Sequence, residues 1–177
     1  MVYVLLVEGF EEIEAIEPID ILRRGGVEVK TVGVNDKVVC GSHGIKVEAD
    51  TDIAGVVRED MELLMLPGGP GHGNIEKSEE AVELIKYAYE KDILLTAICA
   101  SPSILGKMGL LKGKKATCFP GFEEFLEGAE LSGEKAVRDG NIITGKGAGA
   151  AADFGFLMLE ALKGKAVADN IKDVMQY

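Results

Sequence analysis

The stretch ILLTAICASPSIL, residues 93–105, indicates how this chain is built. Its first half, 93–99, is an apolar run without a charged residue, which is typical of a strand buried on both faces of a parallel sheet. Ala-Ser-Pro then opens a short helix, expected over 101–108, because proline is favoured in the first helical turn. A strand that turns directly into a helix is the unit of an α/β sheet, and here the turn carries a cysteine, Cys99.

The rest of the chain repeats this alternation. Apolar runs predict strands at 2–7, 27–34 and 63–67, a short strand at 114–118, and hairpins at 37–50 and 135–145. Apolar residues at helical spacing predict helices at 11–24, 78–91, 150–162 and 165–175, with a kink or break at Pro18. We therefore expect one domain over residues 1–177. Its fold class is α/β: a doubly wound, mostly parallel sheet sandwiched by helices in a flavodoxin-like arrangement, with β-hairpin additions.

The composition excludes several classes of protein. The 177 residues carry a net charge of −11 without a run of Lys or Arg, which argues against nucleic acid and against an anionic membrane surface as partners. No stretch approaches the roughly 18 apolar residues of a membrane span, and the acidic start MVYVLLVEGFEE differs from a signal peptide. Three cysteines without CxxC spacing argue against a disulfide framework and a structural zinc site. We expect a cytoplasmic protein that needs no cofactor.

Two interpretations of Cys99 are open. A free cysteine is often a small buried hydrophobe. At the turn between a strand and a helix, however, helix N–H groups favour an anion, which would lower the thiol pKa and create a nucleophile. Ligands bind beyond the carboxyl ends of parallel strands. We expect three loops to converge there: 8–14, 68–74 and 99–102.

These loops supply the possible partners of Cys99. Glu14 lies at the edge of the apolar stripe of its helix, and a carboxyl group held in an apolar pocket keeps its proton near neutrality. Such a group can donate a hydrogen bond to a thiolate. His72, in the glycine-rich loop LPGGPGHGN, could serve as a base, or it could be an ordinary solvated residue.

Glycine-rich segments suggest two further sites. The main-chain N–H groups of Gly69 and Ala100 could form the two halves of an oxyanion hole, although a tight turn explains the glycines equally well. The segment GKGAGA, 145–150, follows a strand and opens a helix. No strand with a terminal acid follows about 20 residues later, so a dinucleotide site has little support.

Three separated motifs, EGFEEIEAIEPIDILRRGGVEV, LMLPGGPG and AICASPSIL, together resemble the ThiJ/PfpI superfamily, above all its parkinsonism-associated deglycase-like branch. The resemblance covers essentially the whole chain and implies a fold similar to class I glutamine amidotransferase domains. It implies a homodimer, with Cys99 as the elbow cysteine, Glu14 as the acid bonded to it, and Gly69 and Ala100 as oxyanion donors.

The chain departs from the family pattern at two positions. Protease-like members have His directly after the elbow cysteine, where this chain has Ala100, so peptidase activity is not expected. Members reported as glyoxalases or deglycases usually carry a His in a Thr-x-His-Pro-like segment, where this chain has Phe119. General acid–base help is worth about 10²–10⁴ in rate, so its loss weakens the expectation of an efficient glyoxalase. His43 and Lys146 stand where relatives often place basic residues near the cysteine.

These observations leave three functions open. Cys99 could attack a small carbonyl substrate, an α-oxoaldehyde or its protein adduct, in a glyoxalase or deglycase reaction. Cys99 could instead react with an oxidant, which would make the protein a redox sensor or stress chaperone. A hydrolase or amidotransferase-like activity would use His72 as base. Cys118 could resolve an oxidised Cys99 or be a buried core thiol, and Cys40 is expected to be structural.

Overall fold

The computed structural model describes all 177 residues and confirms the predicted α/β architecture. Seven strands form the central sheet in the order β10-β11-β7-β6-β1-β2-β5. All neighbours are parallel except β10 and β11, which form the expected hairpin at one edge. The strands span Val2–Leu6 (β1), Val29–Gly33 (β2), Thr51–Asp52 (β5), Leu63–Leu66 (β6), Leu94–Ile98 (β7), Ala136–Asp139 (β10) and Ile142–Gly145 (β11).

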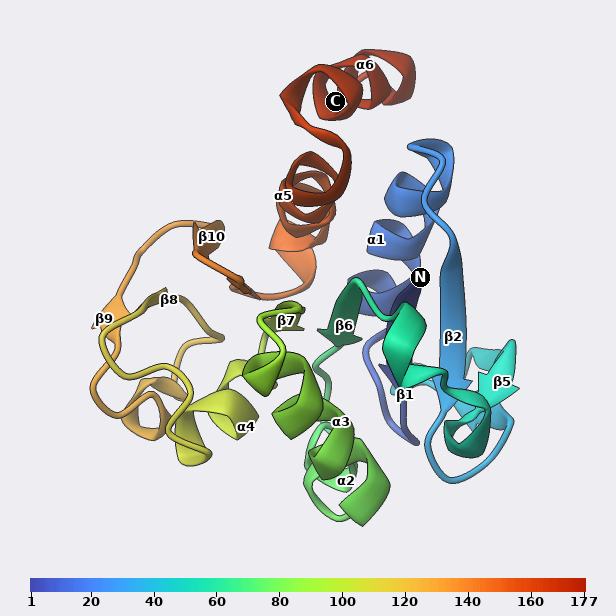
Figure 1. The fold of residues 1–177 in the computed structure, drawn as a ribbon, viewed down its shortest axis with the longest axis vertical. Helices are drawn as coiled ribbons and strands as arrows, with labels where there is room; N and C mark the ends of the chain where they lie inside the picture. The colour runs from blue at the N-terminus through green and yellow to red at the C-terminus, as the bar shows by residue number, and fades with distance from the viewer.

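Helices cover both faces of this sheet, as Figure 1 shows. The helices α1, α5 and α6 pack together on one face, and α2, α3 and α4 lie on the other. They span Glu12–Arg24 (α1), Gly73–Glu76 (α2), Glu79–Glu90 (α3), Pro102–Lys107 (α4), Ala151–Lys163 (α5) and Lys165–Met175 (α6). The break expected at Pro18 is wrong, because α1 runs unbroken through it while Pro18 packs against Gly155 of α5.

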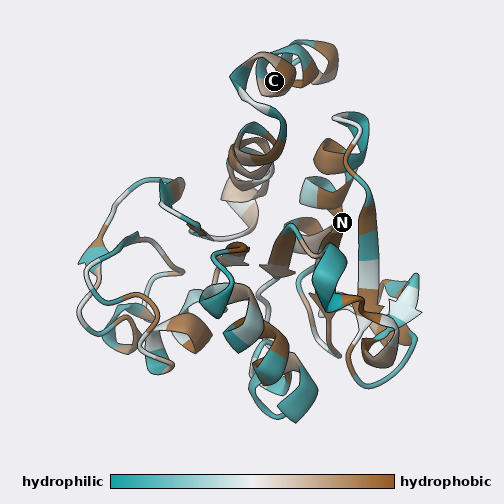
Figure 2. Ribbon diagram, in the orientation of Figure 1, coloured by the Kyte–Doolittle hydropathy of each residue, from teal (hydrophilic) through white to brown (hydrophobic).

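The core consists of two apolar layers, one on each face of the sheet. Alternate residues of β1 point to opposite layers: Val4 and Leu6 join the cluster under α1 and α5, whereas Tyr3 and Leu5 join the cluster under α3 and α4. The central strands β1 and β6 are buried along their whole length and carry no charged residue, and β6 is brown throughout in Figure 2. Burial on both faces explains why the sequence shows continuous apolar runs rather than alternation.

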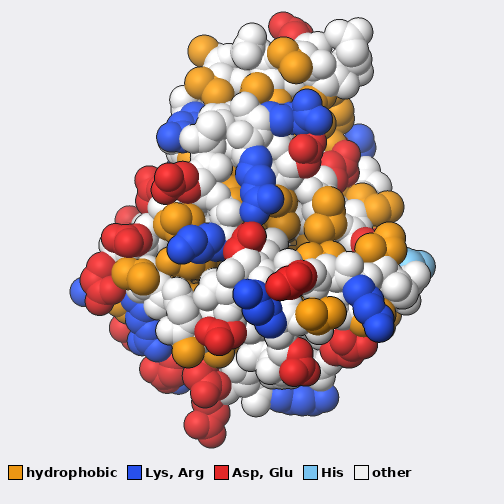
Figure 3. Space-filling view, turned by 90° about the vertical axis from the view of Figure 1, so that its right-hand side faces the viewer, with side chains coloured by type: hydrophobic (Ala, Val, Ile, Leu, Met, Phe, Trp, Pro, Cys, Tyr) orange, Lys and Arg blue, Asp and Glu red, His pale blue; other side chains and the backbone are white.

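Two small sheets lie outside the central one. The hairpin of β3 (Val38–Cys40) and β4 (Lys46–Glu48) is antiparallel, as predicted. The strand expected at 114–118 is shorter and does not extend the central sheet: β8 (Lys115–Ala116) pairs in parallel with β9 (Glu130–Leu131). No helix of the structure is both long and apolar enough to span a membrane. Acidic and basic side chains alternate over the face seen in Figure 3, without a broad basic patch.

Candidate active site

The three loops predicted to converge do meet at the carboxyl ends of β1, β6 and β7. The main-chain N–H of Glu11 donates to the carbonyl of Gly68 at 3.0 Å, which joins the first loop to the second. The hydroxyl of Ser101 donates to the carbonyl of Pro67 at 2.6 Å, which joins the third loop to the residue directly before the second loop. These bonds hold the segments that carry Glu14, Gly69 and Cys99 in one cluster.

Cys99 occupies a sharp turn between β7 and α4. Its φ of 66° lies in the left-handed region, which is uncommon for a residue with a side chain. Hydrogen bonds on both sides hold this backbone: the N–H of Cys99 donates to Gly145, and its carbonyl accepts from the N–H of Phe119 at 2.8 Å. The thiol is half-buried and packs against the apolar layer under α1 and α5.

Glu14 is the acidic partner of this thiol. Its side chain is 1% exposed, accepts a hydrogen bond from the N–H of Gly68 at 3.0 Å, and is hydrogen-bonded to Cys99. Burial, together with the negative charge of Glu11, raises the pKa of Glu14 to about 7, although its hydrogen bonds act in the opposite direction. The carboxyl group is therefore poised to hold or release a proton near neutrality.

The pKa of the Cys99 thiol is raised, whereas the sequence predicts a lowered pKa. Burial, then the charge and hydrogen bond of an ionised Glu14, raise the pKa of Cys99 to about 12. Hydrogen bonding from the main-chain N–H groups of Gly69 and Ala100 acts to lower the pKa of Cys99. Because two adjacent buried anions repel, the pair carries one negative charge between about pH 7 and pH 12, and protonation of Glu14 removes the opposition to a thiolate that comes second to burial.

Neither histidine contacts this pair. The Nδ1 atom of His72 lies 3.0 Å from the carbonyl oxygen of Gly69, and its ring packs edge-on against Phe122. His43 is exposed and lies 2.9 Å from a carboxylate oxygen of Glu12, which raises the pKa of His43. Burial acts to raise the pKa of Glu12, but hydrogen bonds from His43, its own main-chain N–H and Ile45 lower it to about 2.

Small residues that the sequence analysis did not assign to this site complete it. A β-carbon on Gly68 would lie 2.5 Å from the Cβ of Cys99 and 2.6 Å from a carboxylate oxygen of Glu14, so only glycine fits. The segment 145–150, considered above for a dinucleotide, instead brings the main-chain N–H of Ala148 close to Glu14, where it acts to lower the pKa of the carboxyl group. A main-chain N–H group leaves no characteristic side chain in the sequence. The small residues of segment 145–150 are therefore the only sequence feature that indicates a contact with Glu14.

The other cysteines lie apart from the site chemistry. Cys118 is 5% exposed and belongs to the apolar layer on the opposite face of the sheet from the layer that contacts Cys99. Burial, with a smaller effect of Glu123, raises its pKa to about 11. Cys40 lies in β3, where its sulfur donates to the carbonyl of Gly41. This arrangement favours the structural interpretation of both.

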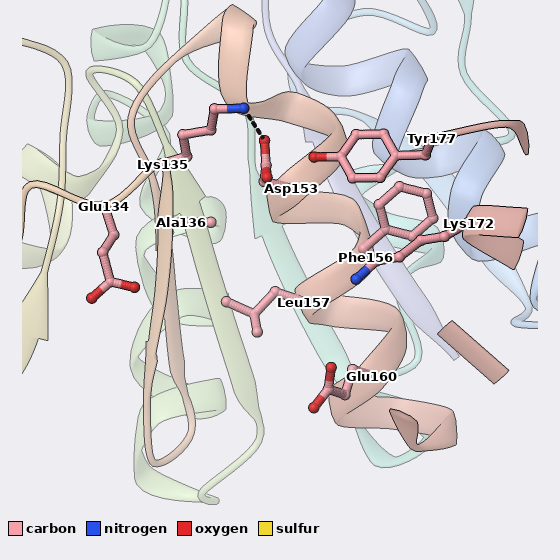
Figure 4. A pocket seen from close by; sticks show the side chains of 9 residues that line it. All are labelled: Glu134, Lys135, Ala136, Asp153, Phe156, Leu157, Glu160, Lys172 and Tyr177. Atoms are coloured by element: carbon pink, nitrogen blue, oxygen red, sulfur yellow. Dashed lines mark ion pairs between the residues drawn. The ribbon is translucent and has the colours of Figure 1, made fainter. Parts of the chain in front are cut away.

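Two pockets flank the region of residue 135. One, of about 330 Å³, is lined by Phe119, Pro120, Lys135 and residues 146–150, and so adjoins Glu14 through Gly147 and Ala148. The other, of about 370 Å³, lies between β10 and α5 and contains none of the candidate catalytic residues (Figure 4). The first pocket is thus the one that adjoins Glu14.

Comparison with known proteins gives concordant matches. A model of the DJ-1/PfpI family matches residues 1–161. Protein DJ-1 homolog B of Arabidopsis thaliana is 38% identical over 174 residues, which are 96% of this chain and 40% of that protein, so the chain spans less than half of its length. A Pyrococcus abyssi protein named as a deglycase is 30% identical over 147 residues, covering 82% of this chain and 89% of that protein.

The solved structures agree with the sequence matches. The structure of oxidized DJ-1 from Toxoplasma gondii superposes with a TM-score of 0.94 at 33% sequence identity. The match covers 99% of this chain and 97% of that one. The likeness therefore extends over the whole sheet and the loops that carry Glu14 and Cys99.

Proposed function

The chain belongs to the DJ-1/PfpI family, and from this premise we propose that Cys99 is the nucleophile of a cofactor-independent reaction on α-oxoaldehydes or their protein adducts. One observation carries the proposal. The buried carboxyl group of Glu14, whose pKa is raised to about 7, lies beside Cys99, and the main-chain N–H groups of Gly69 and Ala100 act on the sulfur as hydrogen-bond donors. This arrangement offers a nucleophile, a proton and donors for developing negative charge.

The proposed reaction proceeds in three steps. Glu14 takes the thiol proton of Cys99 as the sulfur bonds to the aldehyde carbon, and passes it to the carbonyl oxygen to give a hemithioacetal. Glu14 then moves the proton on that carbon to the neighbouring carbon, while the hydroxyl proton passes to the neighbouring ketone oxygen, which leaves a thioester. Water cleaves the thioester, so that methylglyoxal and water yield lactate and free Cys99. Removal of early methylglyoxal adducts from proteins would begin with the same attack.

Glu14 carries the whole of the acid–base work in this proposal. Phe119 replaces the histidine of similar proteins, His43 is paired with Glu12, and His72 contacts Gly69 and Phe122 rather than the thiol. The position of His72 gives no support to a hydrolase that uses it as base. The name of the archaeal relative, a deglycase, supports carbonyl chemistry over hydrolysis.

A second candidate function is oxidation of Cys99 to a sulfenate and then a sulfinate. The N–H groups of Gly69 and Ala100, with a protonated Glu14, are hydrogen-bond donors suited to oxygen atoms added to the sulfur. The related Toxoplasma gondii structure is described as oxidized. In this role the protein would act as a redox sensor or stress chaperone.

The two functions are separated by one set of measurements. Lactate is followed after addition of methylglyoxal to the wild type, to Cys99→Ser and to the control variant Cys118→Ser. Lactate formation that depends on Cys99 alone is expected; equal lactate from all three proteins would exclude the glyoxalase reaction. Intact mass after mild peroxide treatment tests the second function, which requires added oxygen in the wild type and none in Cys99→Ser.

We further propose that the protein is a cytoplasmic homodimer, as the family resemblance implies. Three unpaired cysteines suit a reducing compartment. An exposed apolar patch, here called the α1 patch, supports a self-complementary interface. It comprises Ile13 and Ile16 on α1 together with Ile45 before β4, which are 52%, 41% and 58% exposed. Such large apolar side chains gathered on one surface favour contact with another protein surface.

A further inference from the structure

The pocket beside Glu14 has a direct connection to the reactive pair. A β-carbon on Gly147, which lines this pocket, would lie 3.9 Å from a carboxylate oxygen of Glu14 and 3.2 Å from the ring of Phe119. Phe119 also lines the pocket, and its main-chain N–H donates to the carbonyl of Cys99. One wall of the pocket is therefore built from residues that hold Glu14 and Cys99.

The charge at this pocket is opposite to that of the whole chain. The chain carries a net charge of −11, yet the charged residues that line this pocket are two lysines, Lys135 and Lys146. Lys135 forms an ion pair with Asp153 at 3.1 Å, drawn as the dashed line in Figure 4. Lys146 is exposed and forms no ion pair, although Glu123 lines the adjoining pocket that Lys146 shares.

From these contacts we infer that this pocket admits the substrate and that Lys146 selects carbonyl compounds bearing a carboxylate or phosphate group. The inference rests on the proposed role of Cys99 as nucleophile and adds the class of substrate. The remaining walls are small or apolar, with Ala148, Ala150 and Pro120, so they offer little else to recognise polarity. The ammonium group of Lys146, which has no ion-pair partner, therefore favours substrates with a negative charge over neutral or positively charged substrates in this pocket.

Two alkylating reagents of nearly equal shape and different charge test this selection. Iodoacetate is an anion and iodoacetamide is neutral, and both form a thioether with the sulfur of Cys99 and release iodide. The rates are measured by peptide mass spectrometry for the wild type, Lys146→Gln and Lys146→Glu. The ratio of the iodoacetate rate to the iodoacetamide rate at Cys99 should fall about two- to fivefold in Lys146→Gln and further in Lys146→Glu. Salt at 0.5 M should reduce this difference.

Three controls make the result specific. Lys91→Gln removes another exposed lysine without an ion pair and should leave the ratio at Cys99 unchanged. Cys40 in the same samples reports any general effect of charge. The iodoacetamide rate shows whether each variant keeps an intact site.

The outcomes distinguish this inference from the function on which it rests. An equal ratio in the wild type and both Lys146 variants would overturn the inference, even where Cys99-dependent lactate formation supports the function. A Cys99 that neither reagent modifies would overturn both, because a substrate could not reach the sulfur either.

Discussion

At the scale of single residues, Cys99 is held in a conformation that costs energy. A left-handed φ at a residue with a side chain costs about 1–2 kcal/mol, and hydrogen bonds to Gly145 and Phe119 maintain it. The same turn directs the sulfur toward Glu14 and toward the N–H groups of Gly69 and Ala100. Such strain is typical of sites where the direction of a side chain matters more than local stability.

Gly68→Ala tests how tightly the pair is enclosed. The added methyl group would lie 2.5 Å from the Cβ of Cys99, so it must push Cys99 and Glu14 apart. We expect a loss of about 1–3 kcal/mol in the free energy of unfolding and a large loss of Cys99 reactivity. Urea unfolding and the iodoacetamide rate measure the two effects. Gly73→Ala is the matched control, since nothing lies within 4 Å of its added methyl group; equal effects of both substitutions would contradict the proposed packing.

Glu14→Gln tests the raised pKa through the pH dependence of stability. A carboxyl group whose folded pKa is raised from 4.5 to about 7 stabilises the fold fully below pH 4.5, and this contribution is lost as the pH rises through 7. The wild type should therefore lose on the order of 2–3 kcal/mol relative to Glu14→Gln between pH 4.5 and pH 8. Urea unfolding across this range measures the difference. The exposed Glu90→Gln should show no such trend, and an equal trend in both would refute the assignment.

At the scale of elements, the site consists of the ends of strands and the starts of helices. The cap of α1 places Glu14, because the side chain of Glu11 accepts a hydrogen bond from the N–H of Glu14 at 2.8 Å. The segment between β11 and α5 brings the main-chain N–H of Ala148 close to Glu14, where it acts to lower the pKa of the carboxyl group. The segment after β8 brings Phe119 to the backbone of Cys99. Elements that are far apart in the sequence thus meet only through the order of strands in the sheet.

Phe119→His tests the consequence of the missing histidine. The residue is 46% exposed, so an imidazole is tolerated there without loss of core packing. We expect lactate formation from methylglyoxal to rise about 10- to 100-fold, because a second acid–base group would share the work of Glu14. Phe119→Leu removes the ring without adding a titratable group and is the matched control. Equal rates in the two variants would show that a histidine at this position adds no proton transfer.

The sequence predicts most of these elements because long buried strands and amphipathic helices have clear patterns. It does not predict β5, β9 or α2, since elements of two to four residues are too short to show periodicity. The rule that loops meet at the carboxyl ends of parallel strands predicts that Glu14, Gly69, Ala100 and Cys99 lie close together. The sequence misses Gly68 and Ala148, which act through main-chain atoms. The prediction of a lowered pKa for Cys99 is wrong while Glu14 is ionised. Burial of the thiol raises its pKa more than the main-chain N–H groups of Gly69 and Ala100 lower it.

At the scale of the whole molecule, charged side chains are spread over the surface, whereas several large exposed apolar side chains gather in one patch. The net charge of −11 is spread over the surface, whereas the α1 patch gathers large apolar side chains on α1 and before β4. The patch lies on the helix that carries Glu14, which is one residue from Ile13. A dimer formed through it would therefore cover the surface next to the acid of the reactive pair.

Ile13→Glu tests the proposed dimer. A charge in the centre of a buried apolar interface costs several kcal/mol, so the variant should be monomeric at concentrations where the wild type is a dimer. Light scattering coupled to size-exclusion chromatography measures the mass. Leu131→Glu changes an equally exposed residue of β9 outside the α1 patch and should leave the mass unchanged. A wild type that is monomeric, or an Ile13→Glu variant that remains dimeric, would contradict this interface.

The central claim is that Glu14 and Cys99 share one negative charge. Thiolate absorbance at 240 nm, followed from pH 4 to pH 12, tests it most directly when the background of Cys99→Ser is subtracted. The wild-type thiol should titrate near pH 12, because the carboxylate of Glu14, which forms near pH 7, opposes a second negative charge beside it. The thiol of Glu14→Gln should titrate at a lower pH, because the opposing charge is absent. Identical curves for the wild type and Glu14→Gln would contradict the claim.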